Sequence, residues 1–137
     1  MAEFTSTTIQ TVAAGQNLPL NETAIKGTNC INHRAGAGNV TLRGLTNQCK
    51  ALFKVSFGGN IAIPTGGTVG AISVALAVGG EALNSATAIV TPAAVDQYSN
   101  VFTAVFVEVP RGCCVTVALK NTSTQAISIA NSNLIVE

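Results

Sequence analysis

The stretch Ala71-Ile-Ser-Val-Ala-Leu-Ala-Val78, followed by Gly79-Gly80 and Glu81, decides the fold of this chain. Large apolar residues occupy its even positions and small residues occupy its odd positions. Because successive side chains of a strand point to opposite faces, this alternation predicts a strand that packs tightly on both sides. Both glycines can adopt positive φ, so they predict a tight hairpin to a second strand over residues 82–90.

Similar short apolar segments, separated by Gly, Pro and Asn turns, recur along the whole chain. We expect strands over residues 4–12, 18–25, 27–31, 40–43, 50–57, 71–78, 82–90, 100–109, 114–120 and 127–136. Gly58-Gly-Asn60 is expected to end the strand before it, and no helical periodicity of useful length is present. The sequence therefore predicts an all-β antiparallel jelly-roll sandwich of eight to ten strands. We expect one domain over residues 1–137, with about residues 1–26 as an arm or edge strand.

The chain is unusually poor in charge. Charged residues make up 9% of the 137 residues and the net charge is +1, whereas soluble domains usually have roughly 25% charged residues. This balance argues against nucleic acid or an anionic membrane as a partner. The shortage of charge predicts a surface that is either covered by partner subunits or coated with Ser, Thr, Asn and Gln.

No targeting or membrane segment is visible in the sequence. The most apolar window, residues 61–78, is interrupted by Pro64 and three glycines, which argues against a membrane-spanning helix. The first residues lack the basic region and apolar core of a signal peptide. We therefore expect synthesis and folding in the cytoplasm, and we interpret the Asn-X-Ser/Thr patterns at Asn21, Asn39 and Asn121 as turn residues.

The residues offer little catalytic chemistry. His33 and Asp96 are the only histidine and the only aspartate, so a Ser-His-Asp triad would require both. Cys30-Ile-Asn-His33 has the spacing of half a zinc knuckle, which Cys49 or the adjacent pair Cys113-Cys114 would have to complete. We predict no enzyme activity, no metal and no cofactor. The cysteines are either buried thiols or, for Cys30 and Cys49, partners in a disulfide.

Four phenylalanines are the candidate site residues. Phe53 and Phe57 alternate along one strand, and Phe102 and Phe106 alternate along another. Platforms that stack nucleic-acid bases need exposed rings interleaved with Arg or Lys, and only Lys54 is near these rings. We therefore predict that all four lie in the core or at a subunit interface, and alternation alone does not say which.

The last two-thirds of the chain resembles the jelly-roll domain of complement/tumour-necrosis-factor-like trimers and of collagen-like spore-surface proteins. The segments that carry the resemblance are residues 51–57, 72–81, 105–119 and 129–136, although the glycine that precedes the family's aromatic strand is absent. The resemblance implies a homotrimer that assembles through one sheet, including the strands at 51–57 and 100–109.

A second resemblance covers nearly the whole chain. Residues 41–45, 59–67, 89–95 and 112–114 resemble small proteins encoded near structural genes in phages and prophages of gut Firmicutes. It implies a non-enzymatic virion protein, a capsid decoration or head-fibre component, made in the bacterial cytoplasm and carried on the virion surface. Its partners would be itself and the major capsid protein or another virion protein. One alternative is a fibre-tip module that binds host glycans, with a shallow sugar site formed by the polar loops Gly58–Asn60, Asp96–Asn100 and Asn121–Gln125. The other is a bacterial spore-surface protein.

Overall fold

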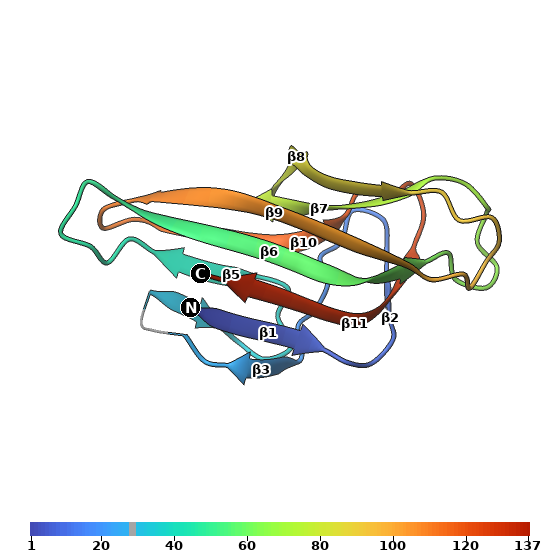
Figure 1. Cartoon of the computed structure of the whole chain (residues 1–137), viewed down its shortest axis with the longest axis horizontal. Helices are drawn as coiled ribbons and strands as arrows, with labels where there is room; N and C mark the ends of the chain where they lie inside the picture. The colour runs from blue at the N-terminus through green and yellow to red at the C-terminus, as the bar shows by residue number, and fades with distance from the viewer. Residues whose placement is uncertain (28–29) are drawn as a thin grey trace.

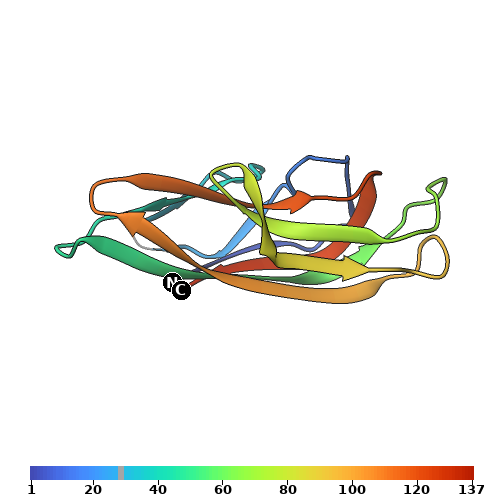
Figure 2. The same cartoon turned by 90° about the horizontal axis from the view of Figure 1, so that it is seen from above.

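The computed structural model describes residues 1–27 and 30–137 and shows two antiparallel sheets packed face to face (Figure 1 and Figure 2). In the first sheet, β2 (Gln10–Val12) pairs with β11, and the strand order is β3 (Glu22–Ile25), β1 (Ala2–Ser6), β11 (Ile127–Val136), β6 (Lys50–Ala62) and β9 (Ser99–Pro110). In the second sheet the order is β4 (Ile31–His33), β5 (Val40–Arg43), β10 (Cys114–Asn121), β7 (Ile72–Val78) and β8 (Glu81–Val90). We call these the β6 sheet and the β10 sheet.

The core lies between the two sheets and follows from the alternation of side chains. On β6, Val55, Phe57 and Ile61 are fully buried, and they belong to one cluster with Val74 and Leu76 of β7. The apolar surface that these side chains remove from water is the main favourable contribution to folding.

The hairpin between β7 and β8 forms as predicted. Gly79 and Gly80 adopt φ values of 63° and 88°, a conformation that residues with a Cβ rarely adopt. The small residues Ala75 and Ala77 are buried, as are the large residues Ile72, Val74 and Leu76 on the opposite face of β7, whereas Ser73 and Val78 are half-buried. The prediction of a strand packed on both sides is therefore confirmed.

The sandwich is closed along one margin, where β8 and β9 run close together. The buried Thr103 hydroxyl of β9 donates a hydrogen bond of 2.8 Å to the Ala86 carbonyl of β8. The two chain ends lie side by side because Ala2 of β1 pairs with Val136 of β11 (Figure 1).

The predicted all-β antiparallel jelly-roll sandwich is confirmed, and the described residues contain no helix, hence none that could cross a membrane. They form eleven strands rather than eight to ten. The segment 4–12 divides into β1 and β2, and only Glu22–Ile25 of the segment 18–25 forms a strand. Thr28 and Asn29, within the strand expected at 27–31, lie outside the described residues.

The prediction that Gly58-Gly-Asn60 ends a strand was wrong. β6 continues to Ala62, and Gly58 and Gly59 pair with Phe102 and Val101 of β9. The strand continues because Phe57 and Ile61, on either side of the glycines, both lie in the core. A Cβ at Gly59 would lie 3.0 Å from Phe57 Cζ, so the glycine here reflects close packing rather than a turn.

Candidate functional site

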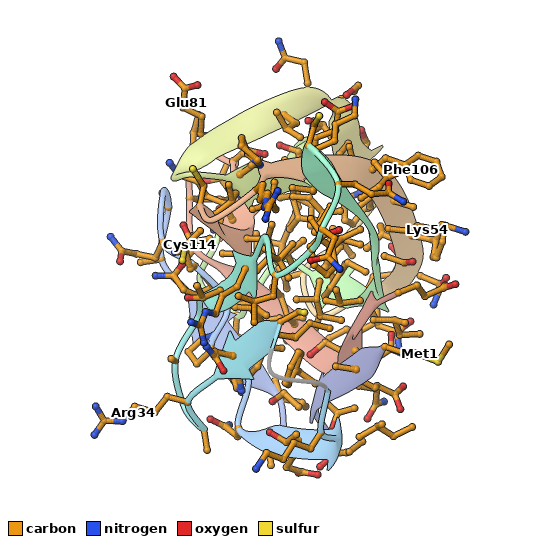
Figure 3. All side chains as sticks on the ribbon, turned by 90° about the vertical axis from the view of Figure 1, so that its left-hand side faces the viewer. Met1, Arg34, Lys54, Glu81, Phe106 and Cys114 are labelled. Atoms are coloured by element: carbon orange, nitrogen blue, oxygen red, sulfur yellow. The ribbon has the colours of Figure 1, made fainter. Side chains whose placement is uncertain are left out.

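The outer face of the β6 sheet carries two exposed aromatic rings. Phe102 and Phe106 of β9 are 67% and 66% exposed, whereas the alternate residues Val101 and Val107 are buried. Figure 3 shows Phe106 and Lys54 projecting from the same side of the molecule. An exposed phenylalanine leaves a large apolar surface in contact with water, so two such rings on one strand make this face a candidate contact surface.

The neighbouring strand extends this surface. Lys54 pairs with Phe106 and Leu52 pairs with Glu108, so the side chains of Lys54 and Leu52 lie on the same face as the two rings. Leu52 is 60% exposed. We call Leu52, Phe102 and Phe106 the apolar patch.

The floor between the two rings is made of small residues. Ala104 separates the rings along β9 and pairs with Ser56 of β6, and Gly58 pairs with Phe102. A Cβ placed on Gly58 would lie 4.0 Å from Phe102 Cδ2. The small residues between the two projecting rings leave space above them, and a large side chain of another molecule can pack there.

Few charges interrupt this face. Lys50 Nζ lies 2.7 Å from Glu108 Oε1, the one salt bridge within residues 1–27 and 30–137. Both side chains are more than half exposed, and an exposed pair contributes only about 0–1 kcal/mol.

A polar depression of about 390 Å³ lies beside Phe102 on the same face. It is lined by Glu3, Thr5, Thr7, Gly58, Gly59, Asn100, Asn131, Ser132 and Asn133. Asn133 Nδ2 donates to Glu3 Oε2 at 3.2 Å, and Asn100 Nδ2 donates to Asn60 Oδ1 at 3.3 Å. Asn131 adopts φ of 51° where β11 bulges away from β6 between Ala130 and Asn133. Such bulges redirect side chains and are common next to binding sites.

The two residues considered for a catalytic triad, His33 and Asp96, both make contacts within the fold. His33 lies in β4, where its ring centroid is 4.6 Å from that of Phe4 and its Nε2 is 3.1 Å from the Ala37 carbonyl. Asp96 lies in the loop before β9, where it accepts a hydrogen bond from Thr65 and its backbone N–H donates to the Ile63 carbonyl. Within the described part of the chain, no three His, Cys, Asp or Glu side chains are grouped to hold a metal ion.

Three of the four cysteines lie at the surface. Cys49, Cys113 and Cys114 are exposed free thiols, so this structure contains no Cys30–Cys49 disulfide. The interpretation of the cysteines as buried thiols is wrong for these three, because they lie in or beside loops.

The four phenylalanines fall into two pairs. Phe53 and Phe57 lie in the core at 8% and 0% exposure, whereas Phe102 and Phe106 lie on the outer face. Sequence reasoning missed Leu52 and the residues of the N-terminal and C-terminal segments that line the polar depression. Alternation along β6 does place Leu52 beside Lys54, but which face is exposed depends on pairing with β9.

The sequence matches no protein-family model and no curated protein. Among solved structures, the globular domain of zebrafish complement 1qA protein is similar, with a TM-score of 0.56, 7% identity, and coverage of 98% of this chain and 94% of that one. Rabbit GITRL gives a TM-score of 0.48 with 14% identity, covering 94% of this chain and 93% of that one. The sugar-binding EclA C-terminal domain gives 0.43 with 16% identity, covering 96% and 80%. At such low identity, the first of these likenesses shows a shared jelly-roll fold, and no more than the fold.

Proposed function

We propose that this chain is a non-enzymatic module that assembles as a homotrimer through the outer face of its β6 sheet. The observation that carries the proposal is the apolar patch, in which Phe102 and Phe106 stand exposed around a floor of small residues. Burying one fully exposed phenylalanine contributes roughly 1.5–3 kcal/mol, so covering two rings on each of three copies favours assembly. The low charge of the chain supports this, because a chain with 9% charged residues has few ionic groups to desolvate.

The proposed setting is the surface of a phage virion, as a capsid decoration or head-fibre protein bound to the major capsid protein or another virion protein. This setting is supported by the sequence resemblance to small proteins encoded beside phage structural genes. Mass spectrometry of virions purified from the producing host tests it. We expect this chain in the particle fraction, and its absence there would refute the virion role while leaving the trimer intact.

The substitution Phe102→Asp tests the trimer. Because Phe102 points away from the core, the protomer should still fold, but the buried charge should dissociate the assembly. Analytical ultracentrifugation measures the mass, and circular dichroism checks the sheet content. The matched control is Ile9→Asp, an equally exposed apolar residue outside the patch, which should leave the mass unchanged. An unchanged mass for Phe102→Asp would contradict the proposal.

The polar depression supports glycan binding as a second candidate function. Its volume of about 390 Å³ lies in the range of small-molecule sites, and its amide and carboxylate groups can bond sugar hydroxyls. The sequence-based alternative named the loops Gly58–Asn60, Asp96–Asn100 and Asn121–Gln125 for a sugar site. Gly58, Gly59 and Asn100 line this depression, whereas no residue of Asn121–Gln125 does. A glycan array is the test: we expect a binder that Asn133→Ala loses and Thr68→Ala keeps. An array without any binder would refute this function.

A further inference from the structure

Two carboxylates lie at the polar depression, those of Glu3 and Glu22, and we call them the acidic rim. Glu3 lines the depression, and Glu22 stands beside it because it pairs with Thr5, another lining residue. The hydroxyl of Thr7, which also lines the depression, donates to Glu22 Oε1 at 3.1 Å. Alternate residues of one strand and paired residues of two strands share a face, so both carboxylates lie on the outer face of the β6 sheet. Their strands, β1 and β3, lie at the opposite end of this sheet from β9, which carries the exposed rings (Figure 1).

Each carboxylate keeps one oxygen that can accept a hydrogen bond from a ligand. Asn133 Nδ2 donates to Glu3 Oε2 at 3.2 Å, and Glu3 Oε1 has no hydrogen-bond partner among the described residues. A Cβ on Gly58 would lie 3.1 Å from Asn133 Oδ1, so the Asn133 amide extends from Glu3 over the floor of the depression. Glu22 Oε2 likewise has no partner in the described part of the chain. An ionised carboxylate only accepts hydrogen bonds, so both oxygens require a donor.

No cation compensates the acidic rim. The residues that line the depression include no Lys, Arg or His. The salt bridge between Lys50 and Glu108, the one found in residues 1–27 and 30–137, involves neither carboxylate. Lys26 lines a different depression, and Lys54 stands two strands away from β1, on β6. The depression therefore carries an uncompensated negative charge, which attracts cations and repels anions.

We propose that the polar depression selects sugars with a free, protonated amine over neutral sugars and excludes acidic sugars such as sialic acid. This inference rests on the glycan-binding function proposed above. A protonated amine only donates hydrogen bonds and so matches the free oxygens of Glu3 and Glu22, whereas an acidic sugar brings a third carboxylate to the site. The sugar hydroxyls can bond the uncharged lining groups of Asn100, Asn131 and Ser132. A lone cationic side chain lacks these hydroxyls, which favours a sugar as the ligand.

Glu3 should contribute most of the preference for the amine. A hydrogen bond between charged groups is roughly twice as strong as a neutral one. Glu3 is half-buried between Ile25 and Ile135, its partners on the two neighbouring strands. Glu22 is exposed, so water screens its charge more strongly than that of Glu3.

The test is isothermal titration calorimetry of the full-length protein with a glucosamine tetramer, its fully N-acetylated counterpart chitotetraose, and sialyllactose. A mildly acidic buffer keeps the sugar amine protonated, and EDTA prevents metal ions from bridging the carboxylates to the sugar. We expect the glucosamine tetramer to bind about tenfold more tightly than chitotetraose, and sialyllactose not to bind. At about 1 M salt, where the Debye length is about 3 Å, this preference should fall to about twofold.

Substitutions that remove one charge each assign the preference to the acidic rim. Glu3→Gln keeps the side-chain shape and an oxygen that can accept the bond from Asn133, so the two tetramers should bind within about twofold of each other. Glu22→Gln should reduce the preference less. The matched control is Glu81→Gln, an exposed glutamate on β8, which should retain the preference of about tenfold. Circular dichroism of each variant checks the fold.

The outcomes separate this inference from the glycan-binding function. Equal binding of the two tetramers, a preference that survives Glu3→Gln, or a preference that does not respond to salt would overturn the inference and leave glycan binding intact. Binding of neither tetramer would overturn it as well, whereas only a glycan array without any binder removes the function itself. The salt series uses the unmodified protein, so it decides the question even where Glu3→Gln fails to fold.

Discussion

At the scale of single residues, the phenylalanines of β6 and β9 show how one residue type has two roles in this fold. Phe57 is fully buried at the centre of the core, whereas Phe106 is 66% exposed on the outer face. The two residues lie on neighbouring strands of one sheet, so the difference comes only from the face to which each side chain points.

We expect Phe57→Ala to lower the free energy of unfolding by about 3–5 kcal/mol, because the cavity left in the core cannot collapse fully. Chemical denaturation in urea, measured under conditions where the assembly is dissociated, provides the number. Phe106→Ala is the matched control and should change protomer stability by less than about 0.5 kcal/mol. Similar losses for the two variants would contradict the assignment of faces.

The sequence predicted which residues alternate but not which face is inward. On β9, one face carries valines and the other carries Phe102, Ala104 and Phe106, so both faces are apolar enough to be buried. The inward face is decided by the register with β6, a long-range pairing that local patterns do not contain.

At the scale of elements, the connection from β10 to β11 depends on one buried polar side chain. Asn121 is 1% exposed, and its Nδ2 donates to the Val12 carbonyl at 2.9 Å and to the Gln125 carbonyl at 3.0 Å. Its Oδ1 accepts a hydrogen bond of 2.9 Å from the Ser123 N–H. Asn121 was interpreted as a turn residue, but it is the last residue of β10, and its side chain ties β2 to the loop that follows.

We expect Asn121→Ala to destabilise the protein by about 2–3 kcal/mol, because two buried carbonyls and one N–H lose their partner. Thermal unfolding followed by circular dichroism measures the loss. The control is Asn84→Ala on the exposed face of β8, which should be nearly neutral. A neutral Asn121→Ala would show that water satisfies these groups instead.

The loop between β5 and β6 packs directly on the turn between β9 and β10. A Cβ at Gly44 would lie 2.3 Å from the Pro110 carbonyl oxygen, so Gly44→Ala must separate the two segments. We expect a loss of about 1–3 kcal/mol in urea denaturation. Gly70→Ala, at a site with open space around it, should be neutral or slightly stabilising. Equal effects would contradict this packing.

Strands and hairpins with strong local signals were predictable, whereas the position of Cys49 beside the turn that holds Cys113 and the length of β6 were not. The Gly79-Gly80 turn is a local feature and was correct, but Gly58-Gly59 looked like another turn. The grouping of Cys49 with Cys113 depends on two loops that meet only when β6 and β9 pair. The polar depression likewise combines residues from four distant parts of the chain.

At the scale of the whole molecule, the scarcity of charge and the position of the exposed rings both favour association between copies of the chain. The core takes most large apolar side chains, yet Leu52, Phe102 and Phe106 remain on one face of one sheet. A protomer with this patch and few charges should associate rather than stay dispersed. Assembly through the patch is thus the property from which the proposed role follows.

Sedimentation equilibrium of the reduced protein at micromolar concentration is the most direct measurement of this property. If the chain assembles through the apolar patch as proposed, it sediments as a single species with three times the 13.9 kDa chain mass. A stable 13.9 kDa protomer under the same conditions would contradict it.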